Sequence, residues 1–305
     1  MNSLANDGVV RIDSAELAHL QQWVGKTETR HDTVTAASVQ ALANTLDRDD
    51  PPAQAGTLLP PLWHWLQFLP QHRQSEIGPD GHPHRGGFLP PVSLPRRMWA
   101  GGRLQWQTAN PLRVGDVVRR DSRIQSVTHK AGRTGDLVFV VVRHGIFNAA
   151  GLAVTEEQDI VYRAMAQPGE TPVAGTPAPQ EAAWSRELTP DPVWLFRYSA
   201  LTFNGHRIHY DRGYATDVEG YPGLVVHGPL IATLLMDLLR RQHADARVAS
   251  FQFKAMRPTF DLHPFRVSGQ ALAPNEPGHG TSAGVQLWAQ DHEGLLTMQA
   301  NATLS

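Results

Sequence analysis

The chain lacks cysteine altogether. This absence excludes a disulfide framework, a thiol nucleophile and thiolate metal ligands, and it fits a reducing, cytoplasmic location. An excess of charge of one sign is also missing, because 27 Lys and Arg residues nearly balance 29 Asp and Glu residues and the formal net charge is -2. Since the basic residues are scattered, the sequence has no electrostatic footprint for nucleic acid.

Long apolar runs are missing as well. The best candidate, from Leu224 to Leu239, is interrupted by His227, Gly228 and Asp237, whereas a membrane span needs about 20 apolar residues. The first eight residues have neither the basic region nor the apolar region of a signal peptide. We therefore expect no membrane partner. G-x-S-x-G, P-loop and dinucleotide glycine motifs are absent too, which argues against serine hydrolases, kinases and Rossmann enzymes.

What is present indicates two halves with one plan. A length of 305 residues favours two domains of about 150 residues. Helical patterns in the first half occupy residues 14–23, 35–46 and 62–69, and the last is a candidate for a buried central helix. Strand patterns follow in each half, at 104–108, 116–127, 137–148 and 152–163, and again at 248–256, 265–273, 282–290 and 295–304. The predicted domains are residues 8–165 and 191–305, joined by a Pro-rich linker at 166–190.

One stretch of the second half crowds polar groups together. It reads Asn204-Gly205-His206-Arg207-Ile208-His209-Tyr210-Asp211 and holds two histidines, an arginine, a carboxamide and a carboxylate. Such a density of polar groups is typical of a functional site rather than of a core.

A helix start follows this loop. His227-Gly228-Pro229 precedes the apolar run from Leu230 to Leu239. Proline suits the first helical position, where its missing N–H is not needed, and Gly228 would lie at the cap. A helix that is apolar on nearly all faces is buried on nearly all faces, so we expect a sheet wrapped around it. Its exposed N-terminal end favours a carbonyl oxygen that gains negative charge, as in thioester chemistry.

These two motifs resemble those of the MaoC-like, (R)-specific hydratase and dehydratase family of hot-dog proteins. The usual family loop runs Asp, any residue, Asn, Pro, an aliphatic residue and His. Aligning its His with His209 places Asn204 at the Asp position, and His206 and Arg207 replace Asn and Pro. That departure resembles one branch, the mesaconyl-C4-CoA and itaconyl-CoA hydratases together with mitochondrial-type hydroxyacyl-thioester dehydratases.

The first half strengthens the resemblance. The stretches Pro95 to Gly102 and Pro111 to Asp116 are similar to the N-terminal half of the same branch, so the resemblance spans residues 8 to 305. It implies an α+β tandem hot-dog fold, in which each half is an antiparallel sheet wrapped around a central helix. Joining the two sheets edge to edge would cover edges that are otherwise exposed. It also implies that the second half is catalytic and that a substrate tunnel runs between the halves.

The resemblance implies catalytic roles for four residues. His209 is the candidate general acid and base, because an imidazole titrates near neutrality; the alternative is a histidine that only bonds backbone in a turn. Asn204 has no useful pKa and would position water. Asp211 either supplies the missing carboxylate or caps the stretch after it. The Gly228 N–H would polarise the thioester carbonyl, unless this glycine serves packing alone.

Substrate binding is assigned to Arg207, His206, His227 and Arg257. Each guanidinium group offers a planar fork for a substrate carboxylate or for the phosphates of coenzyme A; for Arg257 a surface salt bridge is an equal alternative. The stretch His82-Pro83-His84-Arg85 is a weak metal motif without a third ligand nearby, and we expect no metal.

The resemblance thus implies an acyl-CoA hydratase or dehydratase that adds water to a short-chain dicarboxylyl-CoA such as mesaconyl-C4-CoA or itaconyl-CoA. The alternatives are a 3-hydroxyacyl-thioester dehydratase of fatty-acid synthesis, a hot-dog thioesterase and a non-catalytic acyl-CoA-binding protein. No cofactor is expected beyond the coenzyme A of the substrate. The expected partners are the acyl-CoA thioester and a second copy in a homodimer, the commonest assembly.

Overall fold

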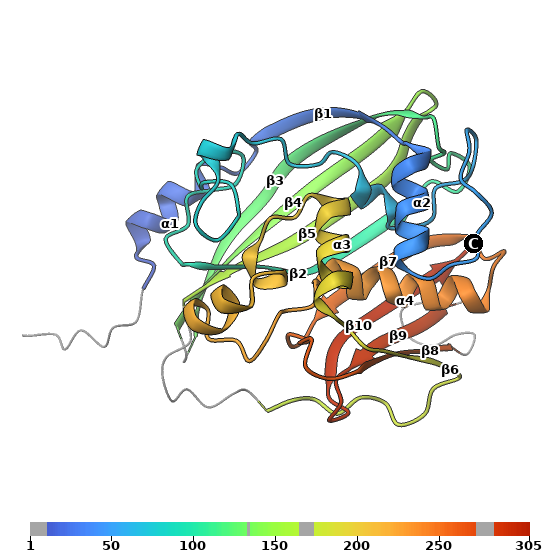
Figure 1. Ribbon diagram of the computed structural model, residues 1–305. Coiled ribbons are helices and arrows are strands. Elements are labelled where there is room, and N and C mark those ends of the chain that lie inside the picture. Colours follow the sequence, from blue (N-terminus) through green and yellow to red (C-terminus); the bar gives the residue numbers. More distant parts are fainter. Residues whose placement is uncertain (1–10, 133–134, 165–173, 273–283) are drawn as a thin grey trace, which may run out of the picture.

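A single antiparallel sheet of ten strands runs through the molecule (Figure 1). The computed structural model describes residues 11–132, 135–164, 174–272 and 284–305. The order of the strands across the sheet is β1-β3-β4-β5-β2-β7-β10-β9-β8-β6. Their bounds are β1 Thr27–Thr33, β2 Arg96–Trp106, β3 Val117–Gly132, β4 Gly135–Asn148, β5 Gly151–Arg163, β6 Trp184–Leu188, β7 Val248–Ala255, β8 Phe265–Ala271, β9 Gly284–Gln290 and β10 Leu296–Leu304.

Strands β2 and β7 join the two halves of the chain. Gly101 pairs with Lys254 and Leu104 with Phe251 along this seam. A Cβ atom at Gly101 would lie 2.7 Å from the Phe253 carbonyl oxygen, and one at Gly102 would lie 2.9 Å from the Phe253 ring. These two glycines therefore permit the close approach of the strands, as a glycine inside a strand often does.

All eight predicted strands are found, although β2 begins at Arg96 rather than at residue 104. Two further strands were not predicted. Edge strand β1 reads TETRHDT and has no apolar side chain, so its sequence has no alternation of apolar and polar residues. The other, β6, lies within the segment 166–190 and pairs with β8. Residues 8–10, 133–134, 165–173 and 273–283 of the predicted domains, linker and strands lie outside the described residues.

The longer helices are α1 Ser14–Gln21, α2 Ala36–Thr45, α3 Pro192–Thr202 and α4 Gly228–Gln242. Short turns complete the chain, namely the 3-10 turns η1 Trp63–Leu66, η2 Gln74–Glu76 and η3 Arg207–His209 and the π turn η4 Tyr214–Val218. Helix α3 was not predicted, although Asp191 caps it by accepting from the Val193 and Trp194 N–H groups. No helix in the described ranges is both long and apolar enough to cross a membrane.

The predicted helix at 62–69 is wrong, because only the four residues of η1 are helical there. Leu62 and Phe68 on either side adopt positive φ angles of 71° and 57°, which end the helix in both directions. The turn is held instead by a buried carboxylate on β5. Glu156 accepts hydrogen bonds from Trp65 Nε1 at 2.9 Å and lies 3.0 Å from His64 Nε2.

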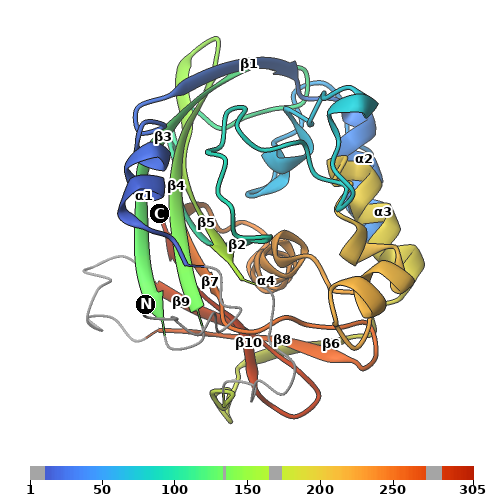
Figure 2. The same ribbon diagram turned by 90° about the vertical axis from the view of Figure 1, so that its left-hand side faces the viewer.

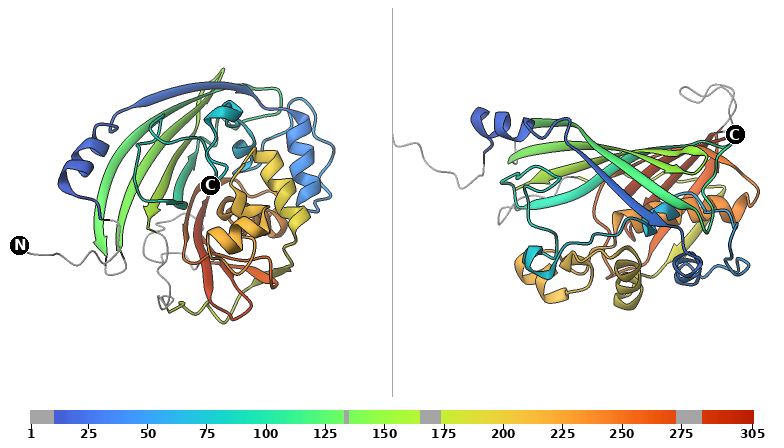
Figure 3. Two further views of the ribbon diagram at one scale, coloured as in Figure 1. Left: turned by 60° about the vertical axis from the view of Figure 1, so that its left-hand side comes forward. Right: turned by 90° about the horizontal axis from the view of Figure 1, so that it is seen from above.

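Helix α4 lies inside the curve of the sheet, with α2 and α3 side by side next to it (Figure 2). Every residue from Leu230 to Leu239 is buried, as the apolar run predicted. Viewed from above, the sheet forms one layer and the helices α2, α3 and α4 lie to one side of it (Figure 3). The N-terminal end of α4 points toward the short turns η3 and η4, and all of the predicted site residues except Arg257 lie in this region.

Candidate active site

Two loops from different halves of the chain meet at the site. The backbone N–H of Arg207 donates to the Asp80 carbonyl oxygen at 2.9 Å, and Arg207 Nη1 donates to the Pro79 carbonyl oxygen at 3.0 Å. The contact is so close that a Cβ atom on Gly81 would lie 1.7 Å from the Gly205 carbonyl oxygen. The first half of the chain therefore covers the polar loop of the second half.

Four imidazole rings, which we call the histidine column, follow one another through this junction. The rings of His82 and His206 lie 4.2 Å apart between centroids, those of His206 and His209 lie 5.5 Å apart, and those of His209 and His227 stack at 3.7 Å. The sequence analysis had treated His82 only as part of a weak metal motif. The structure places it beside two of the predicted site residues.

His209 has a defined tautomer. Its Nδ1 lies 2.7 Å from the Val225 carbonyl oxygen, which can only accept, so Nδ1 carries the proton and Nε2 keeps its lone pair. Burial lowers the pKa of His209 to about 4, although the bond to Val225 opposes that shift. At neutral pH the ring is therefore uncharged, and its Nε2 can accept a proton.

His227 forms the buried end of the column. Its side chain is fully buried, and its Nε2 lies 2.8 Å from the Ser199 hydroxyl. Burial, followed by the neighbouring His209 and His206 rings, lowers the pKa of His227 well below its usual value. His227 is the N-cap residue of α4, one position before the predicted Gly228. It therefore fixes the position of the His209 ring relative to the helix start.

Asn204 and Gly228 each leave one donor available. The Asn204 side-chain oxygen accepts from the His206 backbone N–H at 3.1 Å, so its NH₂ group faces away from that bond. The N–H of Gly228 belongs to the first turn of α4 and has no partner among the described residues. A Cβ atom at Gly228 would meet only the Trp99 carbonyl oxygen, at 3.8 Å, so packing does not require a glycine there.

Asp211 and Arg207 are engaged with each other. Arg207 Nη2 donates to Asp211 Oδ2 at 2.7 Å, and Asp211 Oδ1 accepts from the Tyr214 backbone N–H at 3.0 Å. The bond from Tyr214 and then the one from Arg207 lower the pKa of Asp211. The carboxylate thus caps the helical stretch that begins at Arg212 and continues into η4. A catalytic role for it stays a prediction.

The fourth predicted substrate-binding residue, Arg257, lies elsewhere. Its Nη1 is 3.4 Å from Asp291 Oδ2 in the turn before β10, and its backbone N–H donates to Thr297. None of these partners belongs to the histidine column. Its role in binding substrate also stays a prediction.

The structure supplies the third group that the weak metal motif lacked. Side-chain ligand atoms of Asp80, His82 and His206 lie within 4.8 Å of one another. The two rings are tilted by 36° with 4.2 Å between their centroids. Burial lowers the pKa of both His82 and His206, so both rings are uncharged at neutral pH. The expectation that no metal binds stays a prediction.

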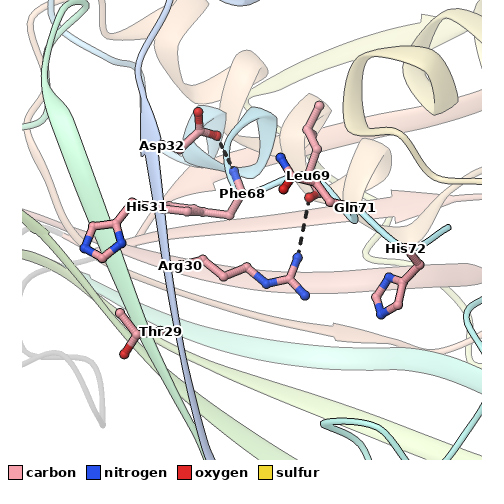
Figure 4. A pocket seen from close by; sticks show the side chains of 8 residues that line it. All are labelled: Thr29, Arg30, His31, Asp32, Phe68, Leu69, Gln71 and His72. Carbon is pink, nitrogen blue, oxygen red and sulfur yellow. Dashed lines mark hydrogen bonds between the residues drawn. The ribbon is translucent and has the colours of Figure 1, made fainter.

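A separate cavity of about 350 Å³ lies beneath strand β1 (Figure 4). Its walls are residues of β1 and of the loop after η1, namely Thr29, Arg30, His31, Asp32, Phe68, Leu69, Gln71 and His72. Arg30 donates to the Leu69 carbonyl oxygen and is paired with Glu28. The cavity contains none of the predicted site residues.

Sequence comparison identifies relatives over most of the chain. The family of hydroxyacyl-thioester dehydratase type 2 matches residues 62–261. The mesaconyl-C(4)-CoA hydratase of Chloroflexus aurantiacus is 46% identical over 285 residues, which cover 92% of this chain and 96% of the relative.

Solved structures share the fold at low sequence identity. A MaoC-like dehydratase superposes with a TM-score of 0.69 and 16% identity, covering 92% of this chain and 98% of its own. A Mycobacterium tuberculosis protein with a double hot-dog fold superposes with a TM-score of 0.57 and 13% identity, covering 92% and 96% of the two chains. The predicted α+β tandem hot-dog architecture is therefore confirmed.

Proposed function

Since the chain belongs to the hydroxyacyl-thioester dehydratase type 2 family of MaoC-like hot-dog proteins, we propose that it hydrates a dicarboxylyl-CoA of the mesaconyl-C4-CoA type. It is an acyl-CoA hydratase, a hydro-lyase, as the family and the 46% identity to a mesaconyl-C(4)-CoA hydratase indicate. The observation that carries the reaction is the tautomer of His209, which presents a bare Nε2 beside the N-terminal end of α4.

Hydration begins with a polarised thioester. The N–H of Gly228 donates to the thioester carbonyl oxygen, and the positive end of the α4 macrodipole supports the negative charge that this oxygen gains. Polarisation withdraws electrons from the C=C bond and makes its β carbon electrophilic. The mostly buried surroundings strengthen the donor, because water does not compete with it.

A water molecule then attacks the β carbon. The Asn204 NH₂ group holds the water, and His209 Nε2 removes one of its protons as the oxygen bonds to the β carbon. The π electrons move to the α carbon and the thioester oxygen. The imidazolium formed at Nε2 returns the proton to the α carbon, so the sum is one water added. A depressed histidine pKa makes this imidazolium a strong acid for the second step.

We expect no cofactor other than the coenzyme A that is part of the substrate. Every proton transfer above has a donor or acceptor in the chain, so the proposal calls for no metal and no redox cofactor.

The two free edges of the sheet, β1 and β6, are the surfaces through which we propose a homodimer. The comparisons do not favour a thioesterase or a non-catalytic binding protein, and a fatty-acyl dehydratase would differ in substrate rather than in chemistry.

Mass spectrometry of the product tests the proposal. Purified protein mixed with mesaconyl-C4-CoA in H₂¹⁸O is expected to form a hydroxyacyl-CoA that carries one labelled oxygen, without release of free coenzyme A. Release of thiol instead would indicate a thioesterase. Hydration of crotonyl-CoA in preference to mesaconyl-C4-CoA would indicate a fatty-acyl dehydratase instead.

A further inference from the structure

An arginine outside the predicted set faces the histidine column. Arg97 lies on β2, where it pairs across the strands with Tyr162 of β5. Directly opposed residues share one face of a sheet. Tyr162 is fully buried and belongs to the same hydrophobic core cluster as Leu94 and Val138. Arg97 therefore projects from the face of the sheet that carries this core, and it is half-buried.

Trp99, two residues further along β2, shows that this face of the strand lies near the N-terminal end of α4. Residues i and i+2 of a strand point to the same side, so Trp99 and Arg97 share a face. The Trp99 ring packs on Trp65 and Phe253, and its carbonyl oxygen is the atom nearest to a Cβ placed on Gly228. The side chain of Arg97 thus projects from the strand that borders the thioester donor.

Arg97 has no acidic partner among the described residues, unlike most arginines nearby. Arg96 pairs with Glu219, Arg103 with Glu157 and Asp159, and Arg207 with Asp211. A half-buried guanidinium group without an ion-pair partner is available to bind an anionic ligand.

Two further groups that can donate to an anion lie near Arg97, and the Asp80 carboxylate beside His82 and His206 is the negative charge of this region. Arg85 lies over the Tyr162 ring at 5.5 Å, and its guanidinium group donates to the carbonyl oxygens of Val92, Leu94 and Pro95. The hydroxyl of Tyr162 is buried and has no hydrogen-bond partner within the described ranges. Two guanidinium groups and an unused hydroxyl donor therefore share one region, and all of these groups suit an anion.

This region lies next to the predicted reaction centre. The positive charge of Arg97 adds to the effect of burial in lowering the pKa of both His82 and His206. The ring of His206 in turn contacts His209 at 5.5 Å between centroids. His206 thus lies near both Arg97 and the proposed base.

We propose that Arg97, assisted by the Tyr162 hydroxyl, binds the free carboxylate of the acyl group and selects dicarboxylyl thioesters. This inference rests on the proposed hydratase function. In mesaconyl-C4-CoA the free carboxylate is attached to the β carbon, the atom that receives water. Its binding site must adjoin the base that activates the water, as Arg97 does, whereas the phosphates of coenzyme A lie at the far end of the pantetheine chain. A guanidinium fork matches both carboxylate oxygens.

Kinetics with paired substrates test the proposal. For Arg97→Gln, kcat/KM for mesaconyl-C4-CoA is expected to fall by about 100-fold, mostly through KM, because a bound carboxylate contributes equally to the ground and transition states. The same variant is expected to change kcat/KM for crotonyl-CoA, which has no carboxylate, by less than about threefold. Tyr162→Phe is expected to give a smaller loss with the same selectivity. Arg103→Gln, on the same strand but paired with two carboxylates, is the matched control.

A binding measurement separates this proposal from the proposed function. Succinyl-CoA and butyryl-CoA are saturated and cannot be hydrated, so their inhibition constants report binding alone. The wild-type preference for succinyl-CoA is expected to disappear in Arg97→Gln and to return in part in Arg97→Lys. An equal loss of kcat/KM on both substrates in Arg97→Gln, or an unchanged preference for succinyl-CoA over butyryl-CoA, overturns the role of Arg97. Neither result would contradict the proposed hydratase function. Failure of the wild-type protein to hydrate mesaconyl-C4-CoA overturns the proposed function instead.

Discussion

The imidazole rings of His209 and His227 stack with 3.7 Å between their centroids and 18° between their planes. Two charged rings cannot occupy such a stack, because like charges at this distance repel strongly. Burial keeps His209 uncharged, and the Val225 carbonyl that holds Nδ1 fixes which nitrogen is bare.

This relationship predicts a particular NMR signature. In ¹⁵N-labelled protein, His209 is expected to be the Nδ1–H tautomer throughout the range of about pH 6 to 8 and to gain its second proton only near its pKa of about 4. Assignment by comparison with His209→Gln identifies the signal. An Nε2–H tautomer, or a titration midpoint close to the ordinary histidine value, would contradict the assigned base.

The same burial predicts that acid destabilises the fold. Burial lowers the pKa of His209 to about 4 and that of His206 to about 3, from a usual value of 6.5. The unfolded chain therefore binds more protons as the pH falls from 6.5 toward 4, and the free energy of unfolding decreases across that window. The lowered pKa of His209 accounts for about 3 kcal/mol of this decrease in the free energy of unfolding.

Urea unfolding at pH 7, 6 and 5 measures this loss. His209→Gln is expected to reduce the slope of the unfolding free energy against pH, because Gln does not titrate. Glu156, whose pKa its hydrogen bonds lower from 4.5 to about 2 against the effect of burial, reduces the free energy of unfolding mainly below pH 4.5. An unfolding free energy that stays constant from pH 7 to 5 would contradict the picture of a neutral, buried column.

Gly228 offers a test of the thioester donor. Because a Cβ atom there meets no group closer than 3.8 Å, Gly228→Ala is expected to leave the free energy of unfolding unchanged or to raise it by up to about 1 kcal/mol. The added methyl group lies where the thioester oxygen must approach the N–H, so kcat/KM is expected to fall at least about tenfold. Full activity with unchanged stability would assign the polarising role to another group.

Gly81 tests the contact between the two loops. Gly81→Ala would place Cβ 1.7 Å from the Gly205 carbonyl oxygen at a φ of +87°, whereas Gly56→Ala has nearly the same φ, +86°, with nothing within 4 Å. Both variants suffer the strain of a positive φ, about 1 kcal/mol or more. Only Gly81→Ala is expected to separate the loops, lower the melting temperature further and abolish hydration. Equal behaviour of the two variants would mean that the loop contact is dispensable.

The sequence predicted the fold wherever apolar residues follow a period. The eight predicted strands and α4 carry such patterns, and all are present. Edge strand β1 has no apolar residue, so its pairing with β3 is determined by tertiary context. At 62–69 the apolar residues suggested a helix, but the turn is shaped by Glu156, which is distant in sequence and holds His64 and Trp65.

The candidate site divides in a similar way. Asn204, His209 and Gly228 lie close together in the chain and could be proposed from a local motif. His82 and Arg97 belong to the other half, and only the loop contact and the β2–β7 seam bring them to the site. The pairing of Arg207 with Asp211 also depends on the bend of the loop at η3, which residue types alone do not specify.

The central claim is that His209 Nε2 transfers the proton during hydration of a dicarboxylyl-CoA. Its most direct test is the loss of enoyl-thioester absorbance with mesaconyl-C4-CoA, measured for the wild type, His209→Gln and His292→Gln. His292 stacks on His263 at 3.8 Å on the exposed surface and is the matched control. The account predicts rapid loss for the wild type and His292→Gln, and kcat lowered by about 10² to 10⁴ in His209→Gln. Wild-type kcat in a correctly folded His209→Gln variant would contradict it.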